Sequence, residues 1–330
     1  MTLAYSQMPL DRCSNNRKNK TWLKAEFNKP DTLFCLINDG KCLFQFDEVK
    51  PLFLSKTQLP SLYVDQCIFL GKSEHVAIFA LDQNKTRFSS QEEFLTLGRW
   101  QSLRQHTSLL NTFDAGILAL AKGLVYWHKS HQFCGQCGSP NNSTEAGHAR
   151  KCTECRNMTF PRTDPAVIML VERMCDDGVP RCLLGRQASW PDGVYSTLAG
   201  FVDPGETLES AVIREVAEES AIIVENPTYI ASQPWPFPAS VMLGFIAQAK
   251  SEKIDTSHDS LENAQWFSRE QVTKFLANLS VINTESKQNG QSNNILQSSE
   301  EKAPQYKMSS HDSIASYLIT AWLNKEIGKY

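Results

Sequence analysis

The sequence predicts an α+β protein in which an N-terminal α+β domain and a four-cysteine metal ribbon precede an α/β/α sandwich. Two pairs of cysteines in the middle of the chain predict the ribbon, and alternating strand-like and helix-like stretches in the second half predict the sandwich. A chain of 330 residues, 41% of them hydrophobic, is long enough for two or three domains. We expect a flexible N-terminus over 1–20, the N-terminal domain over 21–130, the ribbon over 131–160 and the sandwich over 161–330.

Composition and charge exclude several classes of protein. The net charge of −3 gives no general attraction to nucleic acids or anionic membranes. We expect no membrane partner, because no apolar run approaches the roughly 20 residues that a membrane span requires. The first twenty residues are basic but lack an apolar core, which argues against a secretory signal. We expect a cytoplasmic protein. The basic start leaves a mitochondrial location open, and a peroxisomal one is also open, although Gly328-Lys329-Tyr330 is not a Ser-Lys-Leu address.

The N-terminal third contains strand-like runs and then a helical pattern. Residues 32–37, 42–46 and 76–81 are expected to be strands, with Asn38-Asp39-Gly40 as a hairpin turn between the first two. From residue 92 to 127, apolar residues recur at helical spacing. The buried set of these helices is expected to be Leu109, Leu110, Phe113, Ile117, Leu120 and Leu124. No constellation here demands chemistry, so we expect a structural or dimerising role.

Four cysteines are spaced as two C-x₂-C pairs in turn-forming sequence, and the other six show no comparable pattern. The four are Cys134, Cys137, Cys152 and Cys155. Two such pairs supply four thiolates to a tetrahedral Zn²⁺, and a closed four-sulfur shell leaves no open position for catalysis, so we expect structural zinc. A thioredoxin-like redox motif would need a single pair between a strand and a helix. His128, His131 and His148 are expected to be surface residues and not ligands.

The second half alternates strand-like and helical stretches. Residues 165–171 and 181–185 are expected to form a hairpin around a turn at 175–178, followed by strands at 195–198, 228–232 and 241–249. Residues 280–308 are rich in Ser, Asn and Gln and read as a flexible insertion. Ile314, Leu318 and Trp322 lie four apart and predict a closing helix that packs on the sandwich.

A helix that begins near Thr207 carries three glutamates on one face. Glu215, Glu218 and Glu219 are spaced i, i+3, i+4 and continue the stripe of Leu208, Ala211 and Val212. Carboxylates crowded on a half-buried stripe repel one another unless a multivalent cation neutralises them, and oxygen ligands suit Mg²⁺ or Mn²⁺. A solvated surface helix is the alternative that the spacing alone leaves open.

A proline-rich stretch, Ser-Gln-Pro-Trp-Pro-Phe-Pro-Ala-Ser, covers residues 232–240. Its prolines fix the backbone, so Gln233, Trp235 and Ser240 are expected on a rigid loop of the kind that lines a ligand pocket. The alternative is an edge loop or a ligand for an SH3 or WW module.

Gly200, Glu206 and the run Arg214-Glu215-Val216-Ala217-Glu218-Glu219 fall at fixed offsets that resemble the Nudix box, the signature of the Nudix hydrolases. One position departs, because Ala221 stands where the family has a glycine. A glycine there would form a helix C-cap with positive φ, and alanine in that conformation costs roughly 1 kcal/mol. The 232–240 stretch is similar to the SQPWPFPxS motif of the NADH pyrophosphatase branch, which also carries a zinc ribbon. The resemblance covers about residues 125–330.

The resemblance implies the Nudix fold and hydrolysis of NADH, and less well NAD⁺, to NMNH or NMN plus AMP, by a homodimer that uses Mg²⁺ or Mn²⁺. It implies that Glu215, Glu218 and Glu219 bind metal, that Glu219 activates water and that Arg214 orients the cluster. The substrate-binding positions that it implies are Phe160 and Phe201 for adenine, with Gly200, Gln233, Trp235 and Ser240. A further carboxylate usually stands at the position of Ser260, and Asp259 or Glu262 is a nearby substitute.

Two other functions are weighed against this one. Some members of the branch remove NAD caps from RNA, and that reaction needs a basic surface, for which Arg150, Lys151, Arg156 and Arg162 are candidates. A nucleotide-binding protein with weakened catalysis is the other alternative, because Ala221 and Ser260 depart from the family pattern.

Overall fold

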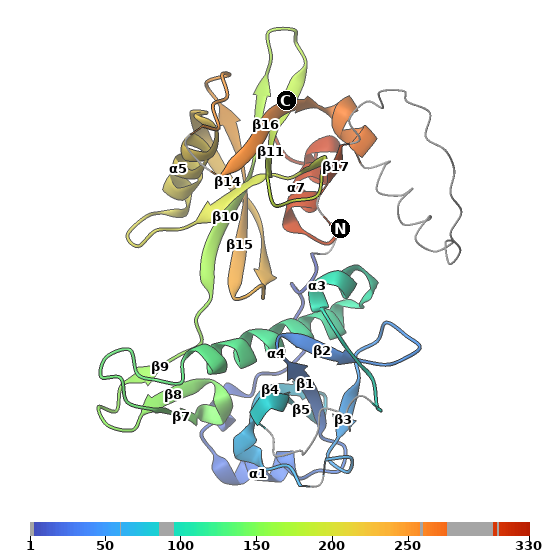
Figure 1. The fold of residues 1–330 in the computed structure, drawn as a ribbon, viewed down its shortest axis with the longest axis vertical. Coiled ribbons are helices and arrows are strands. Elements are labelled where there is room, and N and C mark those ends of the chain that lie inside the picture. The colour runs from blue at the N-terminus through green and yellow to red at the C-terminus, as the bar shows by residue number, and fades with distance from the viewer. Residues whose placement is uncertain (1–2, 60, 86–95, 258–259, 276–305, 309) are drawn as a thin grey trace. The chain divides into compact units, whose positions relative to one another are not determined.

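The computed structural model describes residues 3–59, 61–85, 96–257, 260–275, 306–308 and 310–330 (Figure 1). The chain divides into two compact units. The N-terminal unit contains Thr2–Asp164 and Pro234–Val241, and the C-terminal unit contains Pro165–Gln233 and Met242–Tyr330. The domain boundaries given above stay a prediction.

The N-terminal unit is built on a six-stranded sheet with the order β4-β5-β1-β2-β6, in which β3 also pairs with β1. Its strands are β1 (Leu33–Asn38), β2 (Lys41–Phe44), β3 (Phe53–Ser55), β4 (Cys67–Ser73), β5 (Val76–Asp82) and β6 (Arg99–Gln101). Its helices are α1 (Lys20–Phe27), α3 (Leu103–His106) and α4 (Thr112–Ser130), with short 3₁₀ turns at Ser14–Asn16, Val64–Gln66, Gln83–Lys85 and Thr107–Leu109.

Alternation along β1 explains how this sheet is covered. Cys35 and Ile37 belong to the core cluster that contains the buried face of α4, whereas Phe34 and Leu36 belong to the cluster that contains Phe27 of α1. Because successive strand residues point to opposite faces, the two helices pack on opposite sides of the sheet. The predicted hairpin is confirmed: Asn38 pairs with Lys41 around Asp39 and Gly40, whose φ values are 45° and 76°.

The helical prediction for residues 92–127 is partly wrong. Residues 92–95 lie outside the described residues, β6 is a strand, and α4 begins only after Asn111, whose side chain accepts a hydrogen bond from the Asp114 N–H. Ile117 and Leu124 are buried as expected, but Leu109 is 61% exposed and Phe113 is 36% exposed. The cap at Asn111 sets the start of the helix. Its buried face includes Ala115, Gly116, Ala119 and Ala121, small residues that the apolar spacing did not select.

The N-terminal segment packs on this unit, which corrects the flexible stretch expected over 1–20. Leu3, Tyr5 and Leu10 are buried, and the backbone of Asp11 forms hydrogen bonds of 2.9 and 2.8 Å with the backbone of Lys72 in β4. Polar composition suggested flexibility, yet three apolar anchors and one β-bridge are sufficient to order the described residues 3–20.

The ribbon follows α4 and forms its own three-stranded sheet. Its strands are β7 (Asn141–Thr144), β8 (Ala149–Cys152) and β9 (Met158–Thr159), with a 3₁₀ turn at Glu145–Gly147. This small sheet holds the two cysteine-bearing turns.

The C-terminal unit is built on a six-stranded sheet with the order β14-β15-β10-β11-β16, in which β13 also pairs with β10. Its strands are β10 (Asp164–Met174), β11 (Pro180–Gln187), β12 (Val194–Tyr195), β13 (Leu198–Phe201), β14 (Val224–Trp235), β15 (Ser240–Ala249), β16 (Leu261–Ser268) and β17 (Lys307–Met308). Its helices are α5 (Leu208–Ser220) and α7 (Ile314–Leu323), and residues 269–275 are also helical.

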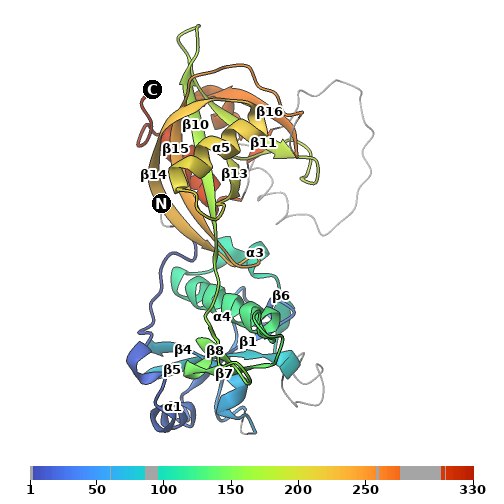
Figure 2. The same ribbon diagram turned by 90° about the vertical axis from the view of Figure 1, so that its left-hand side faces the viewer.

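Strand β10 shows why this unit is a sandwich. Val167 and Met169 pack in one cluster with Val212 of α5. Glu172, on the opposite face of the strand, accepts a hydrogen bond of 3.0 Å from Trp322 Nε1 of α7. The helices α5 and α7 therefore cover opposite faces of the sheet, and the predicted α/β/α arrangement is confirmed (Figures 1 and 2).

The hairpin of β10 and β11 is confirmed, whereas the strand expected at 195–198 is two short strands, β12 and β13. The predicted insertion over 280–308 extends too far. Tyr306 packs on the Tyr195 ring and β17 pairs with β12, while residues 280–305 lie outside the described residues. In the closing helix α7, Ile314, Leu318 and Trp322 are buried, as expected. In the described part of the chain, no helix has the length and apolarity to span a bilayer.

Candidate active site and metal centre

Glu215 of α5 lies directly against Gly200 of β13. Gly200 pairs with Val167 of β10, so the sheet fixes its backbone. A β-carbon at this position would collide with the carboxylate of Glu215. The first glycine of the loop-helix signature is therefore required because the glutamate side chain occupies the space beside it.

The loop before α5 and the end of that helix are held by local interactions. Gly205 has φ of 89°, a conformation that favours glycine. Thr207 caps the helix, because its side chain accepts a hydrogen bond of 3.1 Å from the Ser210 N–H. The helix ends at Ala221, which has φ of 57° and ψ of 14°, so the positive φ expected at this position is confirmed. The predicted strain at Ala221 therefore follows from its observed backbone.

Arg214 joins the acidic side chains around the helix. Its Nε and Nη2 each donate a hydrogen bond of 2.9 Å to Glu206, and its Nη1 donates to Glu215 at 2.8 Å and to Glu218 at 2.9 Å. The hydrogen bonds from Arg214 lower the pKa of Glu206, and the carboxylates, Glu206 first, raise the pKa of Arg214. Nη2 also donates to the carbonyl of Phe201 at 2.9 Å. This geometry suits the orienting role expected of Arg214.

The three glutamates of the helix differ in how deeply they are buried. Glu219 is 5% exposed, whereas the side chains of Glu215 and Glu218 are 13% and 54% exposed. A surface helix would not bury a carboxylate in this way, so the half-buried stripe is the better description. Glu206, Glu215 and Glu218 place three carboxylates around one guanidinium, and this excess of oxygen ligands and charge fits a hard divalent cation.

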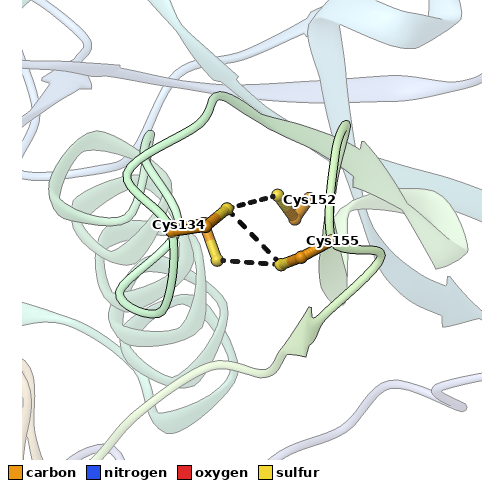
Figure 3. Close-up of side chains that lie close together, drawn as sticks. Cys134, Cys152 and Cys155 are labelled. Atoms are coloured by element: carbon orange, nitrogen blue, oxygen red, sulfur yellow. Dashed lines mark hydrogen bonds between the residues drawn. The ribbon is translucent and has the colours of Figure 1, made fainter.

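The four cysteines of the ribbon converge (Figure 3). Their sulfurs lie within 4.8 Å of one another, and the Sγ–Sγ distance from Cys137 is 3.4 Å to Cys152 and 3.5 Å to Cys155. A tetrahedral Zn²⁺ with Zn–S bonds of about 2.3 Å requires sulfurs about 3.8 Å apart, so the cluster matches zinc. In the described ranges, this is the one group of three or more Cys, His, Asp or Glu side chains that converges so closely. The three glutamates do not converge in this way.

A backbone hydrogen bond changes the pKa of one of the four thiols. A backbone hydrogen bond from Ser139 is the main cause that lowers the pKa of Cys137 to about 6, which favours the thiolate that zinc binds. No histidine belongs to the cluster, as expected. His128 is nevertheless buried and not on the surface, because its Nε2 bonds to the carbonyl of Gly147 at 2.7 Å. The arrangement supports a structural zinc ion.

The aromatic side chains expected to hold adenine are both exposed. Phe160 follows β9 in the N-terminal unit, and Phe201 ends β13 in the C-terminal unit. Each is 60% exposed, so each ring is available to a ligand. Their binding role stays a prediction.

The rigid loop expected to carry Gln233, Trp235 and Ser240 is wrong, because Trp235 ends β14 and Ser240 begins β15. Gln233 is not on a loop either. It lies in β14 and is fully buried. Its Oε1 accepts a hydrogen bond of 2.8 Å from the Ile314 N–H, and its Nε2 donates one of 2.8 Å to the carbonyl of Asp312. In this structure, Gln233 holds the start of α7, and a role in substrate binding stays a prediction.

The aromatic residues of the proline-rich stretch pack in the N-terminal unit. The Trp235 ring lies 5.5 Å from the Arg104 guanidinium, and the Phe237 ring lies 6.0 Å from Tyr5 and 5.2 Å from Lys122 Nζ. Trp235 and Ser240 line a cavity of about 420 Å³ in this unit. Packed rings are not free to bind an SH3 or WW module, so the cavity-lining alternative is favoured.

The candidates for the missing carboxylate and for the basic surface are only partly supported by the structure. Glu262 forms an ion pair with Arg186, and Asp259 lies outside the described residues, so neither is seen to replace the carboxylate missing at Ser260. Arg150 is only 7% exposed, which removes it from the proposed basic surface, whereas Lys151, Arg156 and Arg162 are exposed.

Comparison with known families matches consecutive parts of the chain. Residues 31–127 match the model described as an NADH pyrophosphatase-like rudimentary NUDIX domain, and residues 129–160 match the NADH pyrophosphatase zinc ribbon domain. Residues 162–285 match the NUDIX domain.

Individual proteins are similar over most of the chain. The human NAD-capped RNA hydrolase NUDT12 is 35% identical, covering 82% of this chain and 67% of its own length. NAD-capped RNA hydrolase NudC from Stutzerimonas stutzeri is 37% identical, covering 70% of this chain and 77% of its own length. The mouse mitochondrial NAD(P)H pyrophosphatase NUDT13 is 40% identical, covering 68% of this chain and 65% of its own length.

Proposed function

Because this chain belongs to the Nudix hydrolase family, in the branch with an NADH pyrophosphatase zinc ribbon, we propose that it hydrolyses the diphosphate of NADH. The products are NMNH and AMP, and NAD⁺ is cleaved less well to NMN and AMP. The observation that carries the proposal is the Arg214 cluster, which holds Glu206, Glu215 and Glu218 beside the buried Glu219.

The chemistry follows from charge. A diphosphate repels an anionic nucleophile, so the site must neutralise the substrate and deprotonate water. Glu215, Glu218 and Glu219 would hold Mg²⁺ or Mn²⁺, which supplies positive charge at the diphosphate and a water of lowered pKa. Glu219 takes the proton of the attacking water, the water oxygen bonds to phosphorus, and the anhydride P–O bond breaks so that the other nucleotide leaves as its phosphate. Arg214 keeps the neighbouring carboxylates in place.

An assay of the purified, zinc-loaded protein tests this function. NADH, NAD⁺, ADP-ribose and NAD-capped RNA are each incubated with Mg²⁺ or Mn²⁺, and AMP or the decapped RNA end is measured. We expect AMP and NMNH from NADH at the highest kcat/KM. Binding of NADH without release of AMP would instead support the catalytically weakened nucleotide-binding protein that Ala221 and Ser260 suggest.

Removal of NAD caps from RNA is the second candidate, favoured by the names of the human and Stutzerimonas relatives. Lys151, Arg156 and Arg162 are the exposed basic residues that could contact the RNA backbone. Under this function, Lys151→Glu with Arg156→Glu reduces decapping at least about tenfold and leaves NADH hydrolysis unchanged. Equal effects on both substrates would count against a separate RNA surface.

Several finer statements belong to the same proposal. Phe160 and Phe201 hold the adenine ring, Gly200, Gln233, Trp235 and Ser240 contribute to the pocket, and the enzyme works as a homodimer in the cytoplasm. Light scattering during size-exclusion chromatography measures the oligomeric state, and cell fractionation measures the compartment. A monomer with full activity would remove the dimer from the proposal.

A further inference from the structure

A second cavity in the N-terminal unit, of about 320 Å³, takes no part in the chemistry described above. It lies where β4, the end of β5, α4 and the ribbon strands β7 and β8 approach one another (Figure 1). Its walls include Asp65, Asp82, His128, Ser143 and Arg150, all in the N-terminal unit. The volume is that of a site for a small molecule.

Arg150 gives this cavity a buried guanidinium that forms no ion pair with any other described residue. The residue is 7% exposed, and its guanidinium donates only to neutral acceptors, at 2.9 Å from Nη1 to His128 Nδ1 and at 2.6 Å from Nη2 to the Asn141 carbonyl. Among the residues that the structure describes, no carboxylate forms an ion pair with Arg150, and its Nε has no hydrogen-bond partner. A buried cation without an ion-pair partner is costly, so the space beside the guanidinium favours an anionic group.

His128 does not contribute a second charge. Its Nδ1 accepts a hydrogen bond from Arg150, so this nitrogen carries no proton, and its Nε2 lies 2.7 Å from the Gly147 carbonyl, to which it donates. The imidazole is therefore neutral and positions Arg150. The attraction for an anion comes from the arginine.

The ribbon strands add a hydroxyl beside the guanidinium. Ser143 of β7 pairs with Arg150 of β8, and paired residues of antiparallel strands project from the same face. The Ser143 side chain is exposed, so its hydroxyl is accessible. Thr144 and Ala149 form the neighbouring pair, whose side chains lie on the other face, and neither residue lines the cavity.

The two carboxylates of the cavity restrict which anionic ligands it can bind. Asp65 and Asp82 repel a ligand that is negative throughout, but they accept hydrogen bonds from hydroxyl groups. We propose that this cavity binds the phosphoryl group of a small hydroxylated molecule, such as a sugar phosphate. Arg150 and Ser143 hold the phosphoryl oxygens, and Asp65 and Asp82 accept from the hydroxyls.

Calorimetric titration of the zinc-loaded protein without added divalent cations tests the proposal. The probes are ribose 5-phosphate, inorganic phosphate and ribose. We expect ribose 5-phosphate to bind about tenfold or more tightly than inorganic phosphate, and ribose to give no detectable heat. Absence of binding by both phosphates up to about 10 mM, an affinity of only about −3 kcal/mol, would overturn it.

Ser143→Asp and Thr144→Asp are matched variants on opposite faces of β7, and Thr144 does not line the cavity. Ser143→Asp places a carboxylate beside Arg150, so we expect it to weaken binding of ribose 5-phosphate by about tenfold or more and to raise the melting temperature of the ligand-free protein. Thr144→Asp should do neither. Arg150→Met should abolish binding, and the Ser143→Asp result decides the matter if that variant does not fold. Equal affinity for ribose 5-phosphate in Ser143→Asp and Thr144→Asp would refute the site.

Discussion

The carboxylate of Glu215 fills the space that a β-carbon on Gly200 would need. Gly200→Ala should therefore displace either Glu215 or the edge of β13, and we expect kcat to fall by about tenfold or more, because small misplacements at a reacting centre are costly. Steady-state hydrolysis of NADH measures the effect, with zinc content and melting temperature as checks of folding.

Gly178→Ala is the matched control for that variant. A β-carbon at Gly178 meets open space, and Gly178 differs from Gly200 in having a positive φ, of 74°. We expect this variant to lose roughly 1 kcal/mol of stability and to keep its kcat. If Gly200→Ala retained wild-type turnover, the contact would have no role in placing Glu215.

Glu219→Gln should leave folding and zinc content intact and lower kcat by a factor of ~10² or more, because the amide cannot accept the proton of water. Glu209→Gln, on the exposed first turn of the same helix, should behave as wild type. Rapid-quench measurement of AMP formation separates the chemical step from product release. Near-normal turnover in Glu219→Gln would refute the role of this residue.

Ala221→Gly should stabilise the protein by about 1 kcal/mol, because Ala221 has φ of 57° and glycine adopts this conformation without strain. Ala217→Gly, one turn earlier on the exposed side of α5, should destabilise by roughly 0.5–1 kcal/mol. Urea denaturation measures both. An unchanged or lower stability of Ala221→Gly would contradict the assigned cap strain.

Removal of zinc should unfold the ribbon and lower the melting temperature, since the four thiolates have no other partner of comparable strength. Cys137→Ser should have the same effect, whereas Cys175→Ser, outside the cluster, should retain one zinc per chain. Atomic absorption and differential scanning calorimetry give the two readouts. A chelated, zinc-free protein with unchanged melting would contradict a structural role for the metal.

His148 should make stability depend on pH. Burial lowers its pKa from 6.5 to about 4, and its Nε2 lies 2.6 Å from the Phe69 carbonyl. As the pH falls below about 6.5, the unfolded chain takes up this proton before the folded chain does, so stability is complete above that pH and declines toward pH 4. His148→Gln retains a donor and cannot titrate, and it should reduce this acid loss by up to roughly 3 kcal/mol. Parallel curves of unfolding free energy against pH would argue against His148.

The features that the sequence predicted well are those set by neighbouring residues. Asp39-Gly40 gives a two-residue turn whatever surrounds it, the spacing of Cys134 and Cys137 suits one metal, and the cap geometry at Ala221 follows from the end of its own helix. Asn111 gave an equally local signal for the start of α4, which apolar periodicity alone does not detect.

The features that the sequence did not predict depend on partners distant in the chain. Gln233 is buried because it binds the backbone at Asp312 and Ile314. Arg150 is buried because α4 presents His128 to it across the ribbon. Composition places such polar residues on the surface, so only the tertiary arrangement could reveal where they lie.

Pro234–Val241 belongs to the N-terminal unit, although the strands on either side of it belong largely to the other unit. The backbone passes from one unit to the other at residues 164–165, 233–234 and 241–242. A truncation that starts at residue 161 would keep Trp235 and Phe237 but delete Tyr5, Arg104 and Lys122, against which their rings pack. We therefore expect such a fragment to expose the rings of Trp235 and Phe237 and to aggregate more readily than the whole chain.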